Sequence, residues 1–467
     1  MISTHSNTLA SKHVSPAIPI PRELSAVLGI ILAAAVGGLL AVDLKLGVGA
    51  LLGVLVIPLV LLNLPLGVAA WVPLTFIEAV PGVSLVAMGL LLVLVSAWIS
   101  ILPGRRVTLG AAAHRHSTLL WTLALLATWT TLSAVWASDS GEALEIVWSW
   151  YAALVAFLIV ATTITRPRHL VLFLLAMIRG GIVAALVGFL PGSEGGIDQD
   201  GRLSGGLGDP NFLAVGLVVS MSLATGIAVA TRSTAVRWSL IGTIGFLAAS
   251  LAATGSRGGI IAGVASVVVA LALARGARIR LGGVVLLGLA LVGFWVTTMS
   301  PEMWNRIRDV DTQGTGRVDL WNVAWRMSED NLILGVGANN FRVESSKYVR
   351  EPGSPNDIEL VTEDPHVVHN IYLQQLAETG VVGLALLAIF LALALRATWL
   401  GIHNLEKSGL LRLAVLGRAI LVAQIGALSA SIFLSNGYDQ VLWILLALGP
   451  ALTMVATNPR VPTESIR

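Results

Sequence analysis

Long apolar runs separated by short charged breaks dominate this chain. Many of them approach or reach the roughly 20 residues that a helix needs to cross a bilayer, and their continuity does not suit the alternating strands of a β-barrel. The pattern predicts membrane-spanning helices near 24–42, 46–62, 64–78, 83–102, 117–136, 142–164, 168–190, 210–231, 238–254, 257–275, 280–298, 378–400, 411–434 and 438–457. Because 64–78 is short enough to be an interfacial or re-entrant piece, we expect about 12 to 14 transmembrane helices.

The composition supports an all-α polytopic membrane protein. Of the 467 residues, 56% are hydrophobic and 12% are charged, which leaves too little polar surface for a soluble globule of this size. The absence of cysteine excludes disulfides, thiolate nucleophiles and thiolate metal ligands. The sequence also contains no Walker loop, no dinucleotide fingerprint after a strand and no carboxylate-rich span typical of a cation-coupled pump.

The distribution of Lys and Arg predicts the orientation, because cytoplasmic loops carry an excess of these residues. Alternate loops are basic, and their residues are Arg105, Arg106, Arg115, Arg166, Arg168, Arg232, Arg237, Arg275, Arg278, Arg280, Lys407, Arg412, Arg460 and Arg467. We therefore expect two cytoplasmic tails, a disordered one at 1–23 and a second at 458–467. The short outer loops are nearly free of basic residues, with Arg202 and Arg257 as exceptions.

The same parity places one long loop, 299–377, outside, between N-terminal helices over 24–298 and C-terminal helices over 378–457. Leu320, Val323, Ala324 and Met327 recur at helical spacing and predict an amphipathic helix against the bundle or the lipid interface. We expect a second helix that starts near Pro365, runs through His369 and ends or bends at Gly380.

Three arginines are candidate anion-binding residues on the outer side, and each has a structural alternative. Arg202 lies in a glycine-rich stretch, 201–211, which lets backbone N–H groups approach a ligand but also suits an ordinary flexible loop. Arg257 lies in a tight turn, where it could cap the carbonyls of the preceding helix. Arg317 could be a solvated charge in a loop that contains several others.

His369 is a candidate base, with a hydrogen-bonded structural histidine as the alternative. His366, three residues earlier, could pair with Glu363 or Asp364 on a metal, but no third or fourth ligand stands at a recognised spacing, so we predict no metal and no cofactor. Arg179 lies near the middle of its span, and we expect it to face a polar cavity or a helix carbonyl inside the bundle.

Four short motifs in this order resemble the O-antigen ligase and polymerase superfamily. They are Gly201-Arg202-Leu203-Ser204-Gly205 with Pro210-Asn211, Thr254-Gly255-Ser256-Arg257-Gly258, Gly316-Arg317 with Trp321, Gly335-Val336-Gly337 and Phe341, and His369-Asn370-Ile371-Tyr372-Leu373 with Glu378-Thr379-Gly380. The resemblance covers about 200–390. It implies a multi-span glycosyltransferase whose donor is a glycan on undecaprenyl diphosphate.

The resemblance also implies roles for individual residues. The family's catalytic His falls on His369, and its diphosphate-binding arginines fall on Arg317, Arg257 and Arg202. Asn370, Tyr372, His366 and Arg179 are auxiliary candidates. Some members have a second His where this chain has Val368, which leaves the role of His366 open.

The chemistry of these residue types agrees with that assignment. Arginine offers a permanent charge and a forked set of donors that match phosphate oxygens, so it can replace a metal on a diphosphate leaving group. A neutral imidazole, whose unperturbed pKa is about 6.5, can accept the proton of an attacking sugar hydroxyl. Attack from the face opposite the diphosphate predicts inversion at the anomeric carbon.

Several functions remain open within this interpretation. The enzyme is expected to act in cell-surface polysaccharide or lipopolysaccharide biosynthesis, as an O-antigen ligase-like enzyme or as a repeat-unit polymerase with the same donor chemistry. The acceptor is a glycan, a lipid or a protein, and the sequence indicates no nucleic-acid partner. A transporter of lipid-linked sugars is an alternative from another class, and a receptor or structural membrane protein is a third. We expect a multi-pass protein of the inner (plasma) membrane with its active site on the extracytoplasmic side.

Overall fold

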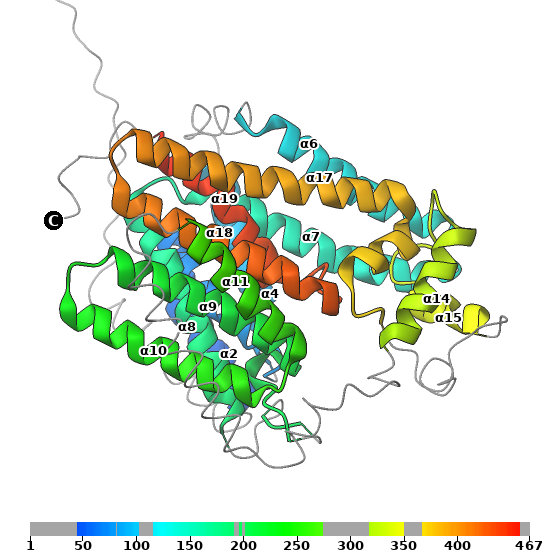
Figure 1. The fold of residues 1–467 in the computed structure, drawn as a ribbon, viewed down its shortest axis with the longest axis horizontal. Helices are drawn as coiled ribbons and strands as arrows, with labels where there is room; N and C mark the ends of the chain where they lie inside the picture. The colour runs from blue at the N-terminus through cyan, green and yellow to red at the C-terminus, as the bar shows by residue number, and fades with distance from the viewer. Residues whose placement is uncertain are drawn as a thin grey trace, which may run out of the picture. The chain divides into compact units, whose positions relative to one another are not determined.

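A computed structural model describes residues 44–80, 82–101, 115–190, 196–198, 201–273, 317–349 and 367–457. The chain divides into two compact units, Met1–Leu52 and Gly53–Arg467. Helix α2 crosses the boundary between them, and every other described element belongs to the second unit. Figure 1 shows that unit as a set of helices, with no strand among the described parts.

The helices are α2 (Leu44–Leu62), α3 (Leu64–Trp71), α4 (Val83–Ile101), α6 (Ser117–Leu132), α7 (Ser140–Thr163), α8 (Pro167–Gly188), α9 (Pro210–Ala230), α10 (Thr234–Ala253), α11 (Arg257–Leu273), α14 (Arg317–Asp330), α15 (Phe341–Val349), α17 (Ile371–Lys407), α18 (Leu411–Ala430) and α19 (Gln440–Ala456). Short 3₁₀ turns are η1 (Val72–Phe76), η3 (Ser133–Val135), η4 (Gly205–Leu207) and η5 (Ser431–Phe433). Within the described ranges the only extended pairing is an isolated bridge between Ile197 and Leu203. The predicted all-α class is confirmed.

Among the described residues, eight helices are long and apolar enough to cross a membrane, and four apolar helices are shorter. Each predicted span from 46–62 to 257–275, and each of the last three, coincides with one of these helices to within a few residues, except that α17 extends well beyond 378–400 at both ends. The predicted spans at 24–42 and 280–298 lie outside the described residues, so the total number of spans stays a prediction. The chain is an integral membrane protein of many helices.

The short segment 64–78 is built from two pieces. Asn63 begins α3 by accepting a hydrogen bond from the backbone N–H of Leu66 (3.4 Å), and the helix then tightens into η1. Gly67 allows a close turn at this point, since a Cβ there would lie 2.5 Å from the Cα of Val60. This piece is therefore shorter than an ordinary membrane-crossing helix.

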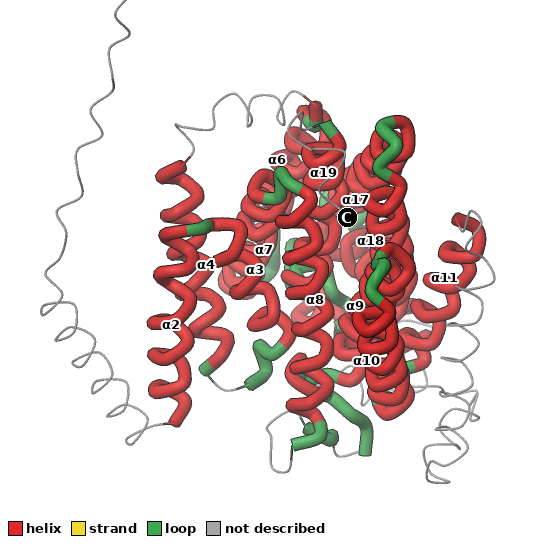
Figure 2. Tube along the Cα trace, turned by 90° about the vertical axis from the view of Figure 1, so that its left-hand side faces the viewer, coloured by secondary structure: helices red, strands yellow, loops and turns green. Residues whose placement is uncertain are grey.

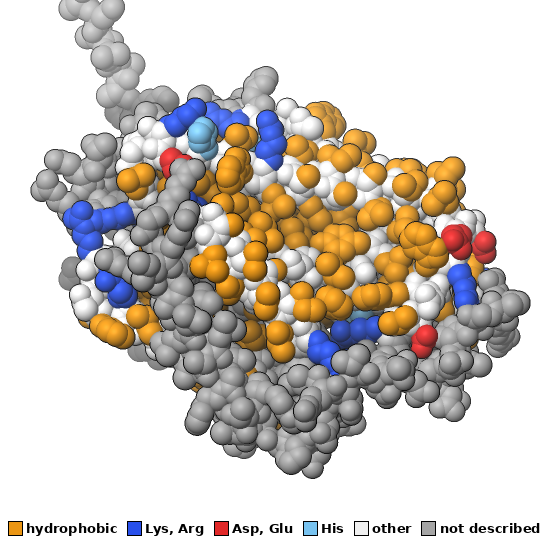
Figure 3. All heavy atoms as spheres, viewed as in Figure 1, with side chains coloured by type: hydrophobic (Ala, Val, Ile, Leu, Met, Phe, Trp, Pro, Cys, Tyr) orange, Lys and Arg blue, Asp and Glu red, His pale blue; other side chains and the backbone are white. Residues whose placement is uncertain are grey.

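The interior of the second unit is formed by α9, α18 and α19, most of whose residues are buried. α9 packs against α8, α10 and α18, and α18 packs against α11, α17 and α19. Figure 2 shows α8, α9 and α10 running side by side. Large hydrophobic side chains such as Trp121, Trp148 and Val264 stay exposed, and Figure 3 shows apolar atoms across the middle of one face, as expected where lipid replaces water.

Chain direction sorts the connections between helices into two groups. One group lies at the end of the helices where α14 is found, and we name it the α14 end. It comprises residues 77–80, 133–139, 196–198, 201–209, 254–256, 331–340, 367–370 and 431–439. Backbone bonds from Ala79 N to Gly206 O (3.0 Å) and from Leu203 N to Ala253 O (3.0 Å) hold it together. Arg115, Arg166, Arg168, Arg232, Arg237, Lys407 and Arg412 lie at the opposite end, as the alternation of basic loops predicts.

Helix α17 bends where the chain leaves the α14 end. Gly380 has φ 68° and ψ −173° inside the helix, and a Cβ there would lie 2.1 Å from the carbonyl oxygen of Ile333. The segment 332–337 fills the bend, since Val381 N donates to Leu332 O (2.8 Å) and Gly337 N to Glu378 O (2.8 Å). The predicted bend at Gly380 is confirmed.

Candidate active site

The loop that carries Arg202 is packed against the end of α10. The side-chain Nε of Arg202 donates to the carbonyl oxygen of Thr254 (2.9 Å), and its backbone N–H donates to Asp198 Oδ1 (2.7 Å). Gly205 has φ 60°, and a Cβ there would lie 2.6 Å from Ala184 O. Gly205 therefore serves close packing, whereas nothing lies within 4 Å of the Cβ position at Gly201.

Arg257 is the first residue of α11, and its side chain is exposed. Ser256 caps this helix by accepting from Gly259 N (3.1 Å), and it donates to Asn211 Oδ1 (2.8 Å). The same Asn211 oxygen accepts from Arg202 Nη2 (3.4 Å). Asn211 thus joins the Arg202 loop to the start of α11, and Arg202 itself bonds to the carbonyl of Thr254 at the end of α10.

Arg317 is the first residue of α14, and it lies close enough to Arg202 and Arg257 for their charges to interact. Burial lowers the pKa of Arg317 most, and Arg202 and Arg257 lower it further, while Asp209 opposes them. Asp209 is engaged in capping α9, since its carboxylate accepts from Asn211 N (2.7 Å) and Phe212 N (3.0 Å). An excess of positive charge remains, which is the environment that an anion requires.

His369 lies two residues before α17 rather than inside a helix that starts near Pro365. Its φ is 52°, a left-handed conformation that is uncommon outside glycine. Asn370 caps the helix by accepting from Tyr372 N (3.0 Å) and Leu373 N (3.1 Å), so the helix begins at Ile371. The expectation of a helix through His369 is wrong because an Asn cap needs non-helical backbone; Pro365 lies outside the described residues.

Trp321 connects α14 to Val368, the residue before His369. It stands one helical turn after Arg317 on α14, and its indole Nε1 donates to the carbonyl oxygen of Val368 (3.0 Å). Its ring lies 5.9 Å from that of Phe433, and Phe433 in turn packs against Gly258, next to Arg257. The structure therefore brings Arg202, Arg257 and Arg317 together at the α14 end, and Trp321 joins α14 to the residue before His369.

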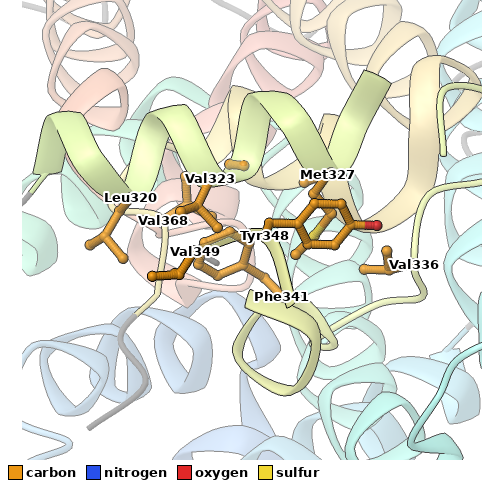
Figure 4. Close-up of a cluster of buried hydrophobic side chains, with 10 residues drawn as sticks. Leu320, Val323, Met327, Val336, Phe341, Tyr348, Val349 and Val368 are labelled. Carbon is orange, nitrogen blue, oxygen red and sulfur yellow. The ribbon is translucent and has the colours of Figure 1, made fainter. Parts of the chain in front are cut away.

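The amphipathic helix predicted from Leu320, Val323, Ala324 and Met327 is confirmed as α14, and all four side chains are buried. They pack on α15 and on Val368, as Figure 4 shows for the labelled side chains. This small apolar core is what fixes the start of α14 relative to the residue before His369. Trp325 and Val318 on the same helix stay exposed.

The auxiliary candidates lie in different settings. Asn370 is the helix cap described above, and the Tyr372 hydroxyl donates to Leu428 O at the end of α18 (2.9 Å), so both have structural roles. Arg179 stands in the middle of α8 with an exposed side chain, and no described contact joins it to the three arginines. His366 and its possible partners Glu363 and Asp364 lie outside the described residues, and the described ranges contain no group of three or more metal-ligating side chains.

Sequence reasoning missed buried polar residues in two places. The first is the connection between η1 and α4, which contains Glu78, and the second is the connection between η5 and α19, which contains Asp439. Burial raises the pKa of the Glu78 carboxyl to about 8, with a smaller contribution from the nearby Asp439. Burial also raises the pKa of Asp439 to about 6, against the hydrogen bonds from Val441 N and Leu442 N. The signal for the second connection was available in Ser435, Asn436, Asp439 and Gln440, four polar residues where an apolar span begins.

A comparison with known protein families finds a match for the middle part of the chain. Residues 242–388 match a family model described as O-antigen ligase. This part of the chain is O-antigen ligase-like. The matched segment contains Arg257, Arg317 and His369, whereas Arg202 lies before it. No curated protein matches the chain.

Proposed function

We propose that this O-antigen ligase-like protein is a glycosyltransferase that moves a glycan from an undecaprenyl-diphosphate carrier to an acceptor hydroxyl. The observation that carries the proposal is the mutual proximity of Arg202, Arg257 and Arg317. It is supported by the hydrogen bond from Trp321, one helical turn after Arg317, to the carbonyl of Val368, the residue before His369. Three guanidinium groups suit a diphosphate, because their forked donors match its oxygens and their charge offsets its own.

His369 is proposed as the general base. Its imidazole would take the proton of the acceptor hydroxyl as the oxygen attacks the anomeric carbon, and the bond from that carbon to the diphosphate oxygen would break. The arginines would stabilise the negative charge that develops on the leaving diphosphate. A base typically contributes about 10²–10⁴-fold to such a step. Attack from the face opposite the diphosphate inverts the anomeric configuration, and the arginines take the part that a metal has in other transferases.

The interpretation as an O-antigen ligase-like enzyme of surface polysaccharide synthesis is the one that the family match favours. A polymerase would share the donor half of the site and differ in its acceptor, which is a glycan, a lipid or a protein. A transporter of lipid-linked sugars would use cations on the diphosphate but has no need for a base. We place the protein in the inner membrane, with the α14 end outside and both termini in the cytoplasm.

The test is transfer by purified protein in proteoliposomes that receive lipid-linked glycan and acceptor but no nucleotide and no ion gradient. We expect product with inverted linkage, and a loss of at least about 100-fold in kcat for His369→Ala. His403→Ala is the matched control, because His403 is exposed near the far end of α17. Uptake of lipid-linked glycan without bond formation, or full activity of His369→Ala, would contradict the proposal.

A further inference from the structure

The connection between η5 and α19, together with the first residue of α19, contains buried polar side chains that have no hydrogen-bond partner among the described residues. Asn436 is 0% exposed, and neither its Oδ1 nor its Nδ2 has a partner among the residues that the structure describes. The same holds for the Ser435 hydroxyl and for Gln440 Oε1. Buried amides are rarely left in this condition, because the hydrogen bonds lost to water are not replaced.

Glu78 faces this connection from another part of the chain. Its carboxyl interacts electrostatically with Asp439, and its buried Oε1 has no partner within the described ranges. Since burial raises the pKa of Glu78 to about 8, the group is protonated at neutral pH and offers one O–H donor and one acceptor. We call Glu78, Ser435, Asn436 and Gln440 the neutral cluster.

The neutral cluster adjoins the candidate active site on two sides. Gly437 packs on Ile371, two residues after His369, with its Cβ position 3.6 Å from the Ile371 side chain. On the other side, Ala79 N donates to Gly206 O (3.0 Å) and so attaches the Glu78 connection to the loop of Arg202. Asp439 is a different case, because its carboxylate already accepts from Val441 N (2.8 Å) and caps α19.

The chemistry of the neutral cluster selects among ligands. The side chains of the neutral cluster offer no cation to a phosphate, and they offer a protonated carboxyl and amides in place of the anionic ligands that a metal ion prefers. Charged groups lie nearby, since Arg342 and Asp439 interact electrostatically with Tyr438, but they are not members of the cluster. Amide, hydroxyl and carboxylic acid groups each donate or accept, as sugar hydroxyls do, and burial makes their pairing selective.

We propose that Asn436, supported by Glu78, Ser435 and Gln440, binds hydroxyl groups of a sugar next to the reacting centre. The inference rests on the proposed transferase function and extends it. The sugar is either the one transferred from the donor or the one that accepts it, and both present the same hydroxyl chemistry. Asn436 is then a specificity-determining residue, whereas the arginines and His369 serve any donor.

Asn436→Leu tests the proposal, because leucine has nearly the shape of asparagine and removes the unpartnered amide. We expect thermal stability to be unchanged or higher, since an unsatisfied buried group is lost, and KM to rise about tenfold for one substrate. The KM for the donor is measured at saturating acceptor, and the KM for the acceptor is measured at saturating donor. The substrate whose KM rises carries the sugar that Asn436 binds. Asn404→Leu near the far end of α17 is the matched control, with both KM values unchanged.

Other outcomes overturn the proposal. If Asn436→Leu folds and neither KM changes, or if it is destabilised with normal kinetics, the amide has only a structural role. Should that variant fail to fold, Glu78→Leu takes its place and Glu78→Gln, which keeps a neutral donor and acceptor, is expected to restore a normal KM. If the wild-type protein transfers nothing, the proposed function fails separately. The neutral cluster is then tested by the thermal shift on adding lipid-linked glycan, which must be smaller in Asn436→Leu than in wild type.

Discussion

At the residue scale, the three arginines differ in burial although they share a charge. Arg317 is half-buried at the start of α14, Arg202 is committed to Thr254 O and Asn211, and Arg257 is exposed. A guanidinium that is already bonded to a carbonyl has fewer donors left for a ligand. Arg317 is therefore the residue from which we expect the largest contribution to diphosphate binding.

Replacing Arg317 with lysine separates charge from geometry. Lysine keeps the cation but loses the planar fork, so we expect Arg317→Lys to lower kcat/KM by about 10-fold and Arg317→Ala by about 100-fold. The measurement is steady-state transfer over a range of donor concentrations. Arg168→Ala at the opposite end serves as the control. Equal activity of Arg317→Ala and wild type would remove Arg317 from the site.

The residue types in the four motifs were sufficient to select the arginines and His369 as candidates. Their separations in sequence could not show that Arg202 bonds to the end of α10 or that His369 has a positive φ, because both depend on neighbours far along the chain. The neutral cluster was missed for the same reason. Glu78 and Asn436 each look like an ordinary polar residue at a helix end until the fold brings their connections together.

At the scale of elements, the position of α14 depends on the bend in α17. Gly380 is the glycine whose replacement should disturb the bend in α17 most, since its φ is 68° and its Cβ position overlaps the carbonyl of Ile333. The segment 332–337 pairs with the bend and leads from α14 to α15. A substitution at Gly380 is therefore expected to shift α14, which begins at Arg317, through the small apolar core shown in Figure 4.

We expect Gly380→Ala to cost more than about 2 kcal/mol in folding free energy, from left-handed strain and from the clash. The measurement is thermal unfolding in detergent by loss of helical circular dichroism. Gly242→Ala is the matched control, because nothing lies within 4 Å of its Cβ position on α10, and we expect it to be neutral or slightly stabilising. A Gly380→Ala variant as stable as Gly242→Ala would show that the bend adapts.

Hydrophobic length predicted the helices of this chain well, because lipid requires every backbone N–H and C=O of a span to be bonded within it. The start of α17 was predicted less well. Asn370 satisfies the first N–H groups of the helix, and a capping signal of one residue is weaker than a run of apolar residues.

At the scale of the whole molecule, the second unit separates its polar functions between two ends. The α14 end holds the arginine cluster, His369 and the neutral cluster, and the opposite end holds most basic residues of the short described loops. Cytoplasmic loops carry the excess of Lys and Arg. We therefore predict that the α14 end faces away from the cytoplasm, where a lipid-linked glycan would be presented.

Labelling of introduced cysteines tests this orientation without background, because the chain contains no cysteine. Ile197→Cys marks the α14 end and Ser408→Cys the opposite end, and both positions are exposed. In intact cells a membrane-impermeant maleimide should label Ile197→Cys alone, and permeabilised cells should show both. Labelling of Ser408→Cys alone in intact cells would reverse the orientation and place the site in the cytoplasm.

By itself, the sequence determined the class of the protein, most helix positions and the residue types of the site, since these follow from the local pattern of apolar, basic and glycine residues. The tertiary structure decided which of those residues meet. Three contacts join segments that are far apart in the chain. Trp321 bonds to the carbonyl of Val368, Arg202 bonds to the carbonyl of Thr254, and Glu78 interacts electrostatically with Asp439. Such contacts arise from helix packing, and the spacing of residues along one chain does not specify them.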